Sequence, residues 1–194
     1  GGAERRGQGA RGGERVRIGD SARERRQDAG PGHGAASGAP PTGTPETVNQ
    51  SALSAFIWSV ADLLRGDFKQ SEYGRVILPF TVLRRLDCVL EATKPAVLTE
   101  LAEREKAGLN PEPFLLRITD RGFYNTSPLD LKKLVGDPDH IRENLFSYVQ
   151  GFSSAARDIF EHFEFPTQVG RLEKAKLLYQ VTERFEQIDL HPEV

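Results

Sequence analysis

The side chains that most often carry chemistry are few in this 194-residue chain and lie far apart. A metal site needs several Cys, His or carboxylate ligands at short spacing, and a catalytic nucleophile needs a neighbouring base. No such spacing is present, and no glycine-rich phosphate loop occurs. Three glutamates, Glu161, Glu164 and Glu173, fit the solvated face of a helix. The four histidines, His33, His140, His162 and His191, are scattered without metal-ligand spacing. The sequence therefore predicts no catalytic, cofactor-binding or metal-binding residue.

The single cysteine, Cys88, excludes an internal disulfide and fits a reducing compartment. It lies within a helical pattern, so we interpret it as a small, inert helix residue rather than a reactive thiol. No apolar run reaches the roughly 18 residues that a membrane span needs, and no signal peptide is recognisable. The sequence therefore predicts a cytoplasmic protein.

Two neighbouring segments, residues 53–64 and 71–90, have apolar side chains at spacings of three and four, which indicates one face of a helix. Gly66 is placed to end the first helix. Pro79 lies inside the second pattern, which continues on both sides of it, so we expect a kinked helix rather than a break. Trp58, beside the apolar positions of the first helix, is predicted to be at least partly buried.

Further helical patterns follow over residues 95–107, 129–135, 138–152, 154–163 and 178–188, while residues 114–118 are interpreted as a short extended piece. The predicted fold is all-α, an irregular bundle of about six to eight helices, formed by residues 47–194.

Residues 1–46 differ from the rest, with 12 of the 19 glycines, eight arginines, no lysine and almost no large apolar side chain. Such a segment buries too little surface to offset chain entropy, so it is predicted to be disordered. Two interpretations remain: an Arg-Gly tail that binds phosphates, or a non-native extension ahead of a start at Val48. We favour the second.

Charge divides in the same way. Residues 1–46 carry 8 Arg against 6 Asp and Glu, a net of +2, and residues 47–194 carry 18 Lys and Arg against 22 Asp and Glu, a net of −4. A mildly acidic folded part lacks the strongly basic signature of an autonomous nucleic-acid-binding domain. Any contact with DNA must come from a local patch or through a partner.

Many short pieces of the folded part recur in a characteristic order and spacing: FIW at 56–58, ADLLRG at 61–66, VILPF at 76–80, LRRLD at 83–87, FYNTSP at 123–128, NLFSYVQGFS at 144–153, LLYQVTERF at 177–185 and IDLHP at 188–192. In these pieces the folded part resembles the N-terminal helical domain of the methyltransferase (modification) subunit of type I restriction-modification systems. The resemblance covers roughly residues 50–194 and depends on the order and spacing of the pieces rather than on one diagnostic motif.

The resemblance implies a subunit of a site-specific adenine DNA methyltransferase that uses S-adenosylmethionine in its full-length form. Its implied partners are DNA, the specificity and restriction subunits, and a second copy of the modification subunit. The base-binding loop of such enzymes resembles Asn-Pro-Pro-Phe, whereas residues 110–114 read Asn-Pro-Glu-Pro-Phe and follow no strand. We therefore interpret them as a turn, and the chain as a fragment or truncated product without a catalytic site or cofactor of its own.

By this resemblance the domain helps to close the complex around DNA and to assemble the subunits, so one basic patch is expected on a mostly acidic surface. The candidate contacts with DNA or other subunits are Lys69, Arg75, Arg84, Arg85, Lys132 and Lys133. For each of them, an ordinary solvated cation is the alternative. For the whole chain, the alternative is a free-standing helical interaction or adaptor protein without catalysis.

Overall fold

The computed structural model describes residues 45–192, with side chains from residue 50 onward. These residues all belong to one unit of the chain, residues 43–194. Of the predicted tail, only Pro45 and Glu46 are described, and both lie in the first helix; the predicted disorder of the remainder lies outside the described residues. Apart from two isolated bridges, the described residues contain helices and loops and no β-strand. The all-α prediction is confirmed.

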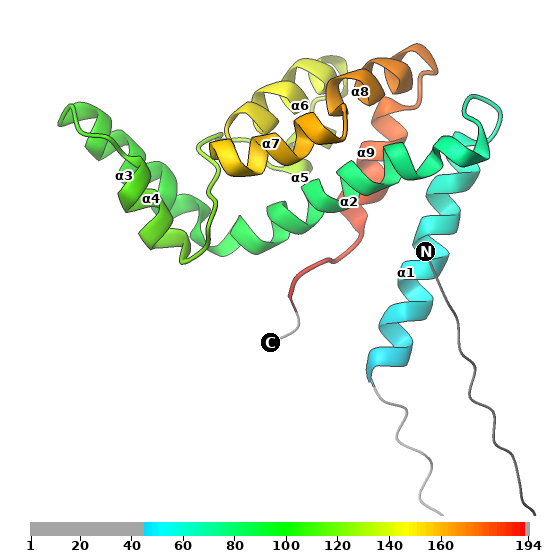
Figure 1. Cartoon of the computed structure of the whole chain (residues 1–194), viewed down its shortest axis with the longest axis horizontal. Coiled ribbons are helices and arrows are strands. Elements are labelled where there is room, and N and C mark those ends of the chain that lie inside the picture. The colour runs from blue at the N-terminus through cyan, green and yellow to red at the C-terminus, as the bar shows by residue number, and fades with distance from the viewer. Residues whose placement is uncertain (1–44, 193–194) are drawn as a thin grey trace, which may run out of the picture. The chain divides into compact units, whose positions relative to one another are not determined.

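The described part of the chain forms nine α-helices and three short 3-10 helices (Figure 1). In chain order they are α1 (Pro45–Leu64), η1 (Gln70–Glu72), α2 (Tyr73–Leu90), η2 (Glu91–Thr93), α3 (Lys94–Lys106), α4 (Glu112–Thr119), α5 (Leu131–Val135), η3 (Pro138–His140), α6 (Ile141–Gln150), α7 (Ser154–His162), α8 (Phe165–Lys174) and α9 (Leu178–Gln187).

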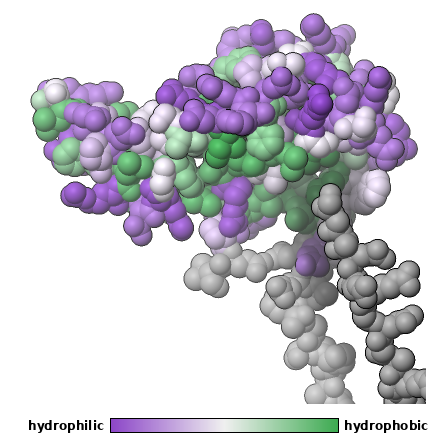
Figure 2. All heavy atoms as spheres, viewed as in Figure 1, coloured by the Kyte–Doolittle hydropathy of each residue, from purple (hydrophilic) through white to green (hydrophobic). Residues whose placement is uncertain are grey.

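Helix α2 runs through the centre of the domain and contacts α1, α8 and α9 (Figure 1). It continues through Pro79, as predicted, and its buried face includes Phe80, which is fully enclosed. The Phe80 ring packs 5.2 Å from Phe165 of α8 and 5.5 Å from Phe185 of α9, measured between centroids. Polar side chains cover the helices at the top of Figure 2, and apolar ones gather in the middle of that face.

Two helix ends use glycine as the sequence predicts. Gly66, after α1, has φ +103°, and Gly108, after α3, has φ +68°. These are left-handed conformations that cost glycine little. After Gly108 the amide of Leu109 donates back to the carbonyl of Arg104 at 3.0 Å, which satisfies a carbonyl in the last turn of α3.

The extended structure predicted for residues 114–118 is wrong, because they lie in helix α4. Asn110 forms a turn just ahead of this helix, in which its side-chain oxygen accepts from the amide of Glu112 at 3.1 Å. Leu115 is fully buried, and the Phe114 ring lies 4.0 Å below the guanidinium of Arg104 in α3. Helix α4 is therefore stabilised by packing against α3, which the sequence pattern alone did not indicate.

The predicted burial of Trp58 is also wrong, since its side chain is 65% exposed. At about 100° per residue, a side chain two positions from Phe56 and two from Val60 lies about 200° around the helix from each. Val60 is fully buried, so Trp58 faces away from the core. Leu53 and Ile57 of α1 are exposed as well.

The loop before α5 is fixed to the junction between α6 and α7. The buried side chain of Asn125 donates to the carbonyl of Tyr148 at 3.0 Å and accepts from the amide of Ser127 at 2.7 Å. The amide of Thr126 donates to the carbonyl of Gly151 at 2.8 Å. These bonds position the start of α5, where the candidate lysines lie.

After α9, residues 188–192 run back along α2 (Figure 1). We call this segment the C-terminal strap. Arg84 Nε donates to the carbonyl of Ile188 at 2.8 Å, and Arg85 donates to the carbonyl of Leu190 at 2.5 Å. Two arginines of one helix thus hold a segment more than 100 residues away in sequence.

Candidate functional site: a charged pocket beside helix α2

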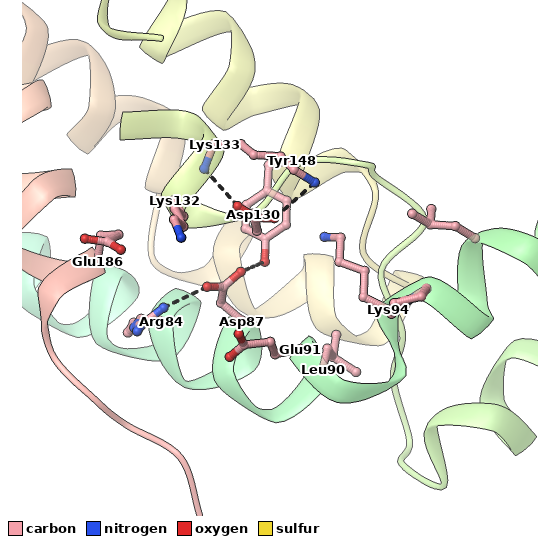
Figure 3. A pocket seen from close by; sticks show the side chains of 12 residues that line it. Arg84, Asp87, Leu90, Glu91, Lys94, Asp130, Lys132, Lys133, Tyr148 and Glu186 are labelled. Carbon is pink, nitrogen blue, oxygen red and sulfur yellow. Dashed lines mark hydrogen bonds and ion pairs between the residues drawn. The ribbon is translucent and has the colours of Figure 1, made fainter. Parts of the chain in front are cut away.

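A pocket of about 560 Å³ is formed by side chains of α2, η2, α3, α5, α6 and α9 (Figure 3). Nine of its twelve lining residues are charged or polar. It is lined by Arg84, Asp87, Leu90, Glu91, Lys94, Pro95, Leu98, Asp130, Lys132, Lys133, Tyr148 and Glu186. Three of the six cations predicted from the sequence, Arg84, Lys132 and Lys133, therefore meet at one place.

Asp87 connects α2 to α6 at the base of the pocket. Its carboxylate accepts from Arg84 NH1 at 2.9 Å and from the hydroxyl of Tyr148 at 2.5 Å. Tyr148 is buried, and burial, followed by the charge and hydrogen bond of Asp87, raises the pKa of its hydroxyl well above its ordinary value. Figure 3 shows both bonds converging on Asp87. The guanidinium of Arg84 also donates to the carbonyl of Ile188 on the strap, so this side chain holds structure together.

Lys94, at the start of α3, forms another wall of the pocket. Its ammonium donates to the carbonyl of Leu129 and lies 4.9 Å from the centroid of the Tyr148 ring. Burial lowers the pKa of Lys94, while the negative charges of Asp87 and Asp130 act in the opposite direction. Lys94 is thus a half-buried cation held between a carbonyl, an aromatic ring and two carboxylates.

Helix α5 brings two more cations. Asp130 caps this helix by accepting from the amide of Lys133 at 2.8 Å. The Lys133 ammonium donates to the carbonyl of Pro128 at 2.6 Å and pairs with Asp130 at 3.1 Å. Lys132 is exposed, and among the described residues no hydrogen bond or ion pair occupies it. Both lysines lie at the rim, where a large partner can reach them.

The lining carries four cations and four carboxylates, so the interior of the pocket has no excess of positive charge. Two cations already have carboxylate partners, Arg84 with Asp87 and Lys133 with Asp130. A polyanion gains little from a neutral, internally paired pocket. The part suited to a phosphate backbone is therefore the α5 rim, where Lys132 has no carboxylate partner among the described residues and Lys133 is exposed although it pairs with Asp130.

The other predicted cations lie elsewhere. Lys69 and Arg75 are both exposed, at η1 and the first turn of α2, and Arg75 is nine residues, about 13 Å along the helix, from Arg84. Arg85 is exposed beside the strap. The single basic patch expected from the sequence is therefore distributed over separate parts of the surface.

Sequence reasoning missed Lys94 and Tyr148, which complete the pocket. The Arg84–Asp87 pair could be predicted from the sequence, because opposite charges three residues apart on a helix are neighbours. No sequence signal connects Tyr148 to Asp87, because 61 residues separate them and only the packing of α6 on α2 brings them together. The burial of Cys88 in α2 agrees with its interpretation as a helix residue.

The fold and pocket define a class: an all-α domain with a charged pocket beside its central helix. The family model of the HsdM N-terminal domain matches residues 53–185, well over half of the chain, and the chain belongs to this family. It is thus an N-terminal domain of the methyltransferase (M) subunit of type I restriction-modification systems. No curated protein and no solved structure matches it. Among the described helices, none has the length and apolar character to cross a membrane.

Proposed function

We propose that this domain contacts DNA and assembles subunits within a cytoplasmic, adenine-specific type I DNA methyltransferase. The observation that carries the proposal is the pair of adjacent, exposed lysines, Lys132 and Lys133, that α5 presents at the rim of the pocket. Family membership supplies the enzyme class. The methyl donor of the full-length subunit is S-adenosylmethionine, by the same resemblance.

The contact with DNA is assigned to Lys132 and Lys133. Lysines at an exposed rim bind phosphate oxygens and position a protein on the duplex without reading its sequence. In this proposal the choice of target belongs to the specificity subunit. Arg84 and Arg85 serve mainly to hold the C-terminal strap, because both donate to its carbonyls.

The subunit contact is assigned to helix α1. Leu53 and Ile57 lie one turn apart, and with Trp58 they leave three large apolar side chains exposed on this helix. Large exposed apolar side chains, tryptophan above all, are typical of protein interfaces. The proposed partners are the specificity and restriction subunits and a second copy of the modification subunit.

The test supplies this chain in trans to an M subunit that lacks the domain, together with the specificity subunit. We expect the chain to join the complex in sedimentation velocity and to restore its affinity for duplex DNA. An Ile57→Asp, Trp58→Asp variant, which adds charge to α1, should lose association. A free-standing adaptor protein would instead leave the truncated complex and its DNA affinity unchanged, and that result would overturn the proposal.

A further inference from the structure

Three side chains able to bind metal ions meet where the C-terminal strap passes α2. One ligand atom each from Cys88, Asp189 and His191 lies within 4.8 Å of the other two. Glu91 borders this group through His191, with its Oε2 atom 3.1 Å from Nε2 of the histidine. No local sequence pattern indicates the group, because about 100 residues separate its two halves.

The fold brings the two halves together through bonds outside the group. Arg84 and Cys88 share one face of α2, because they lie four residues apart, and Glu91 follows three residues later at the start of η2. On this face Arg84 fixes the carbonyl of Ile188, and the neighbouring Arg85 fixes that of Leu190. These two carbonyls alternate with Asp189 and His191 along the strap. The ligands from the strap are therefore held opposite Cys88 by two arginines that bind no metal.

The orientation of His191 also suits a metal ligand. Its Nδ1 lies 2.6 Å from Oδ1 of Asp189, and its Nε2 faces Glu91. Each ring nitrogen therefore lies beside a carboxylate. A divalent ion would displace the proton between His191 and Asp189, so that Asp189 turns from the ring nitrogen to the metal.

We propose that Cys88, Asp189 and His191 bind a divalent transition-metal ion of the zinc class, with Glu91 as a fourth carboxylate, and that the ion fixes the strap to α2. Thiolate and imidazole ligands select such ions over Mg²⁺ or Ca²⁺. The thiol releases its proton to solvent as the metal–sulfur bond forms.

The site must contract slightly to bind. Tetrahedral zinc with bonds of 2.0–2.3 Å places its ligand atoms about 3.3–3.8 Å apart. The 4.8 Å limit of the present group exceeds this by about 1.0–1.5 Å, which rotation of side chains can provide. Asp189 and His191 are exposed and can turn once the ion replaces the hydrogen bond between their side chains, whereas Cys88 is buried.

The test uses Co²⁺ as a spectroscopic probe on the full chain. We expect one ion per chain, a thiolate-to-cobalt charge-transfer band in the near ultraviolet, and loss of that band when Zn²⁺ displaces cobalt. Cys88→Ser should abolish the band, and Asp189→Asn and His191→Ala should each weaken binding at least about tenfold.

His140→Ala is the matched control. His140 is exposed and its Nδ1 lies 2.9 Å from Asp137, as His191 lies beside Asp189, but no thiol accompanies it. This variant should bind cobalt as the wild type does. Because Asp189 lies on the surface, Asp189→Asn should keep the fold even if a change at Cys88 does not. Saturating Co²⁺ without the thiolate band, or unchanged affinity in both Asp189→Asn and His191→Ala, would overturn the proposal.

Discussion

At the scale of single residues, the Asp87–Tyr148 bond is the main polar link between α2 and α6. Tyr148→Phe removes a hydroxyl that donates to a carboxylate at 2.5 Å inside the core. We expect a loss of about 1–3 kcal/mol in the free energy of unfolding, measured by urea denaturation. Tyr179→Phe is the control, since its hydroxyl bonds Glu183 one turn away at the surface. Equal effects of the two changes would contradict the assigned role of Asp87.

The same tyrosine predicts the alkaline behaviour of the domain. Its pKa is raised in the folded state by burial and by Asp87, so above about pH 10 the unfolded chain ionises first. The unfolded state then binds fewer protons than the folded state, and stability falls as pH rises. We expect the free energy of unfolding to fall less steeply with pH in Tyr148→Phe than in the wild type. Urea denaturation between about pH 9 and pH 11, a range that spans the ordinary tyrosine pKa, measures this. Parallel curves would show that Tyr148 does not cause the loss.

Gly151 permits a close backbone approach at the junction of α6 and α7. A Cβ atom there would lie 2.7 Å from Oδ1 of Asn125 and from the amide nitrogen of Ser127. Gly151→Ala should therefore destabilise the domain by about 1–3 kcal/mol in thermal or urea unfolding. Gly170→Ala, inside α8 with no atom within 4 Å of its Cβ, should instead stabilise it by about 0.5–1 kcal/mol. A neutral Gly151→Ala would mean that the loop yields easily.

At the scale of elements, helix α1 gives a direct spectroscopic prediction, because Trp58 is the only tryptophan. Its 65% exposure predicts an emission spectrum close to that of a solvated indole and efficient quenching by acrylamide. Trp58→Ala should change the free energy of unfolding of the isolated chain by less than about 0.5 kcal/mol. A blue-shifted, protected emission would indicate that α1 is covered, for example by self-association, which sedimentation would reveal.

Most helices could be predicted from the sequence because their apolar spacing is strong. The pattern around Phe80 survives even Pro79, since burial of that face outweighs one lost hydrogen bond. Helix α4 was missed because it is short, proline-flanked and stabilised by α3. Trp58 lies close in sequence to Phe56 and Val60, but residues two positions apart lie on nearly opposite faces of a helix, so this closeness does not indicate burial.

The candidate sites could be predicted only in part. The sequence identifies Arg84, Lys132 and Lys133 as candidate contacts, but no local pattern shows that side chains of α2 and α5 line one pocket. The C-terminal strap has no periodicity at all, and hydrogen bonds to Arg84 and Arg85 determine its path. The contact between Glu91 and His191 spans about 100 residues of sequence, so it can be seen only once the helices have packed.

At the scale of the whole molecule, the charge of residues 47–194 limits what the domain does alone. A net charge of −4 predicts weak, non-specific binding to duplex DNA, with a dissociation constant of about 10⁻⁴ M or poorer at physiological salt. Residues 1–46, with a net of +2, should strengthen binding only modestly and without sequence preference. Within a complex, tethering beside other DNA-binding subunits raises the effective concentration without new contacts.

The salt dependence of DNA affinity in the assembled methyltransferase tests the central claim most directly. Lys132→Ala with Lys133→Ala should weaken binding and reduce the slope of log affinity against log salt by up to about two units. The control pair Lys106→Ala with Lys174→Ala removes the same charge from exposed sites outside the pocket and should leave the slope unchanged. If the Lys132 and Lys133 variant keeps the wild-type affinity and slope in a fully assembled complex, the α5 rim does not contact DNA.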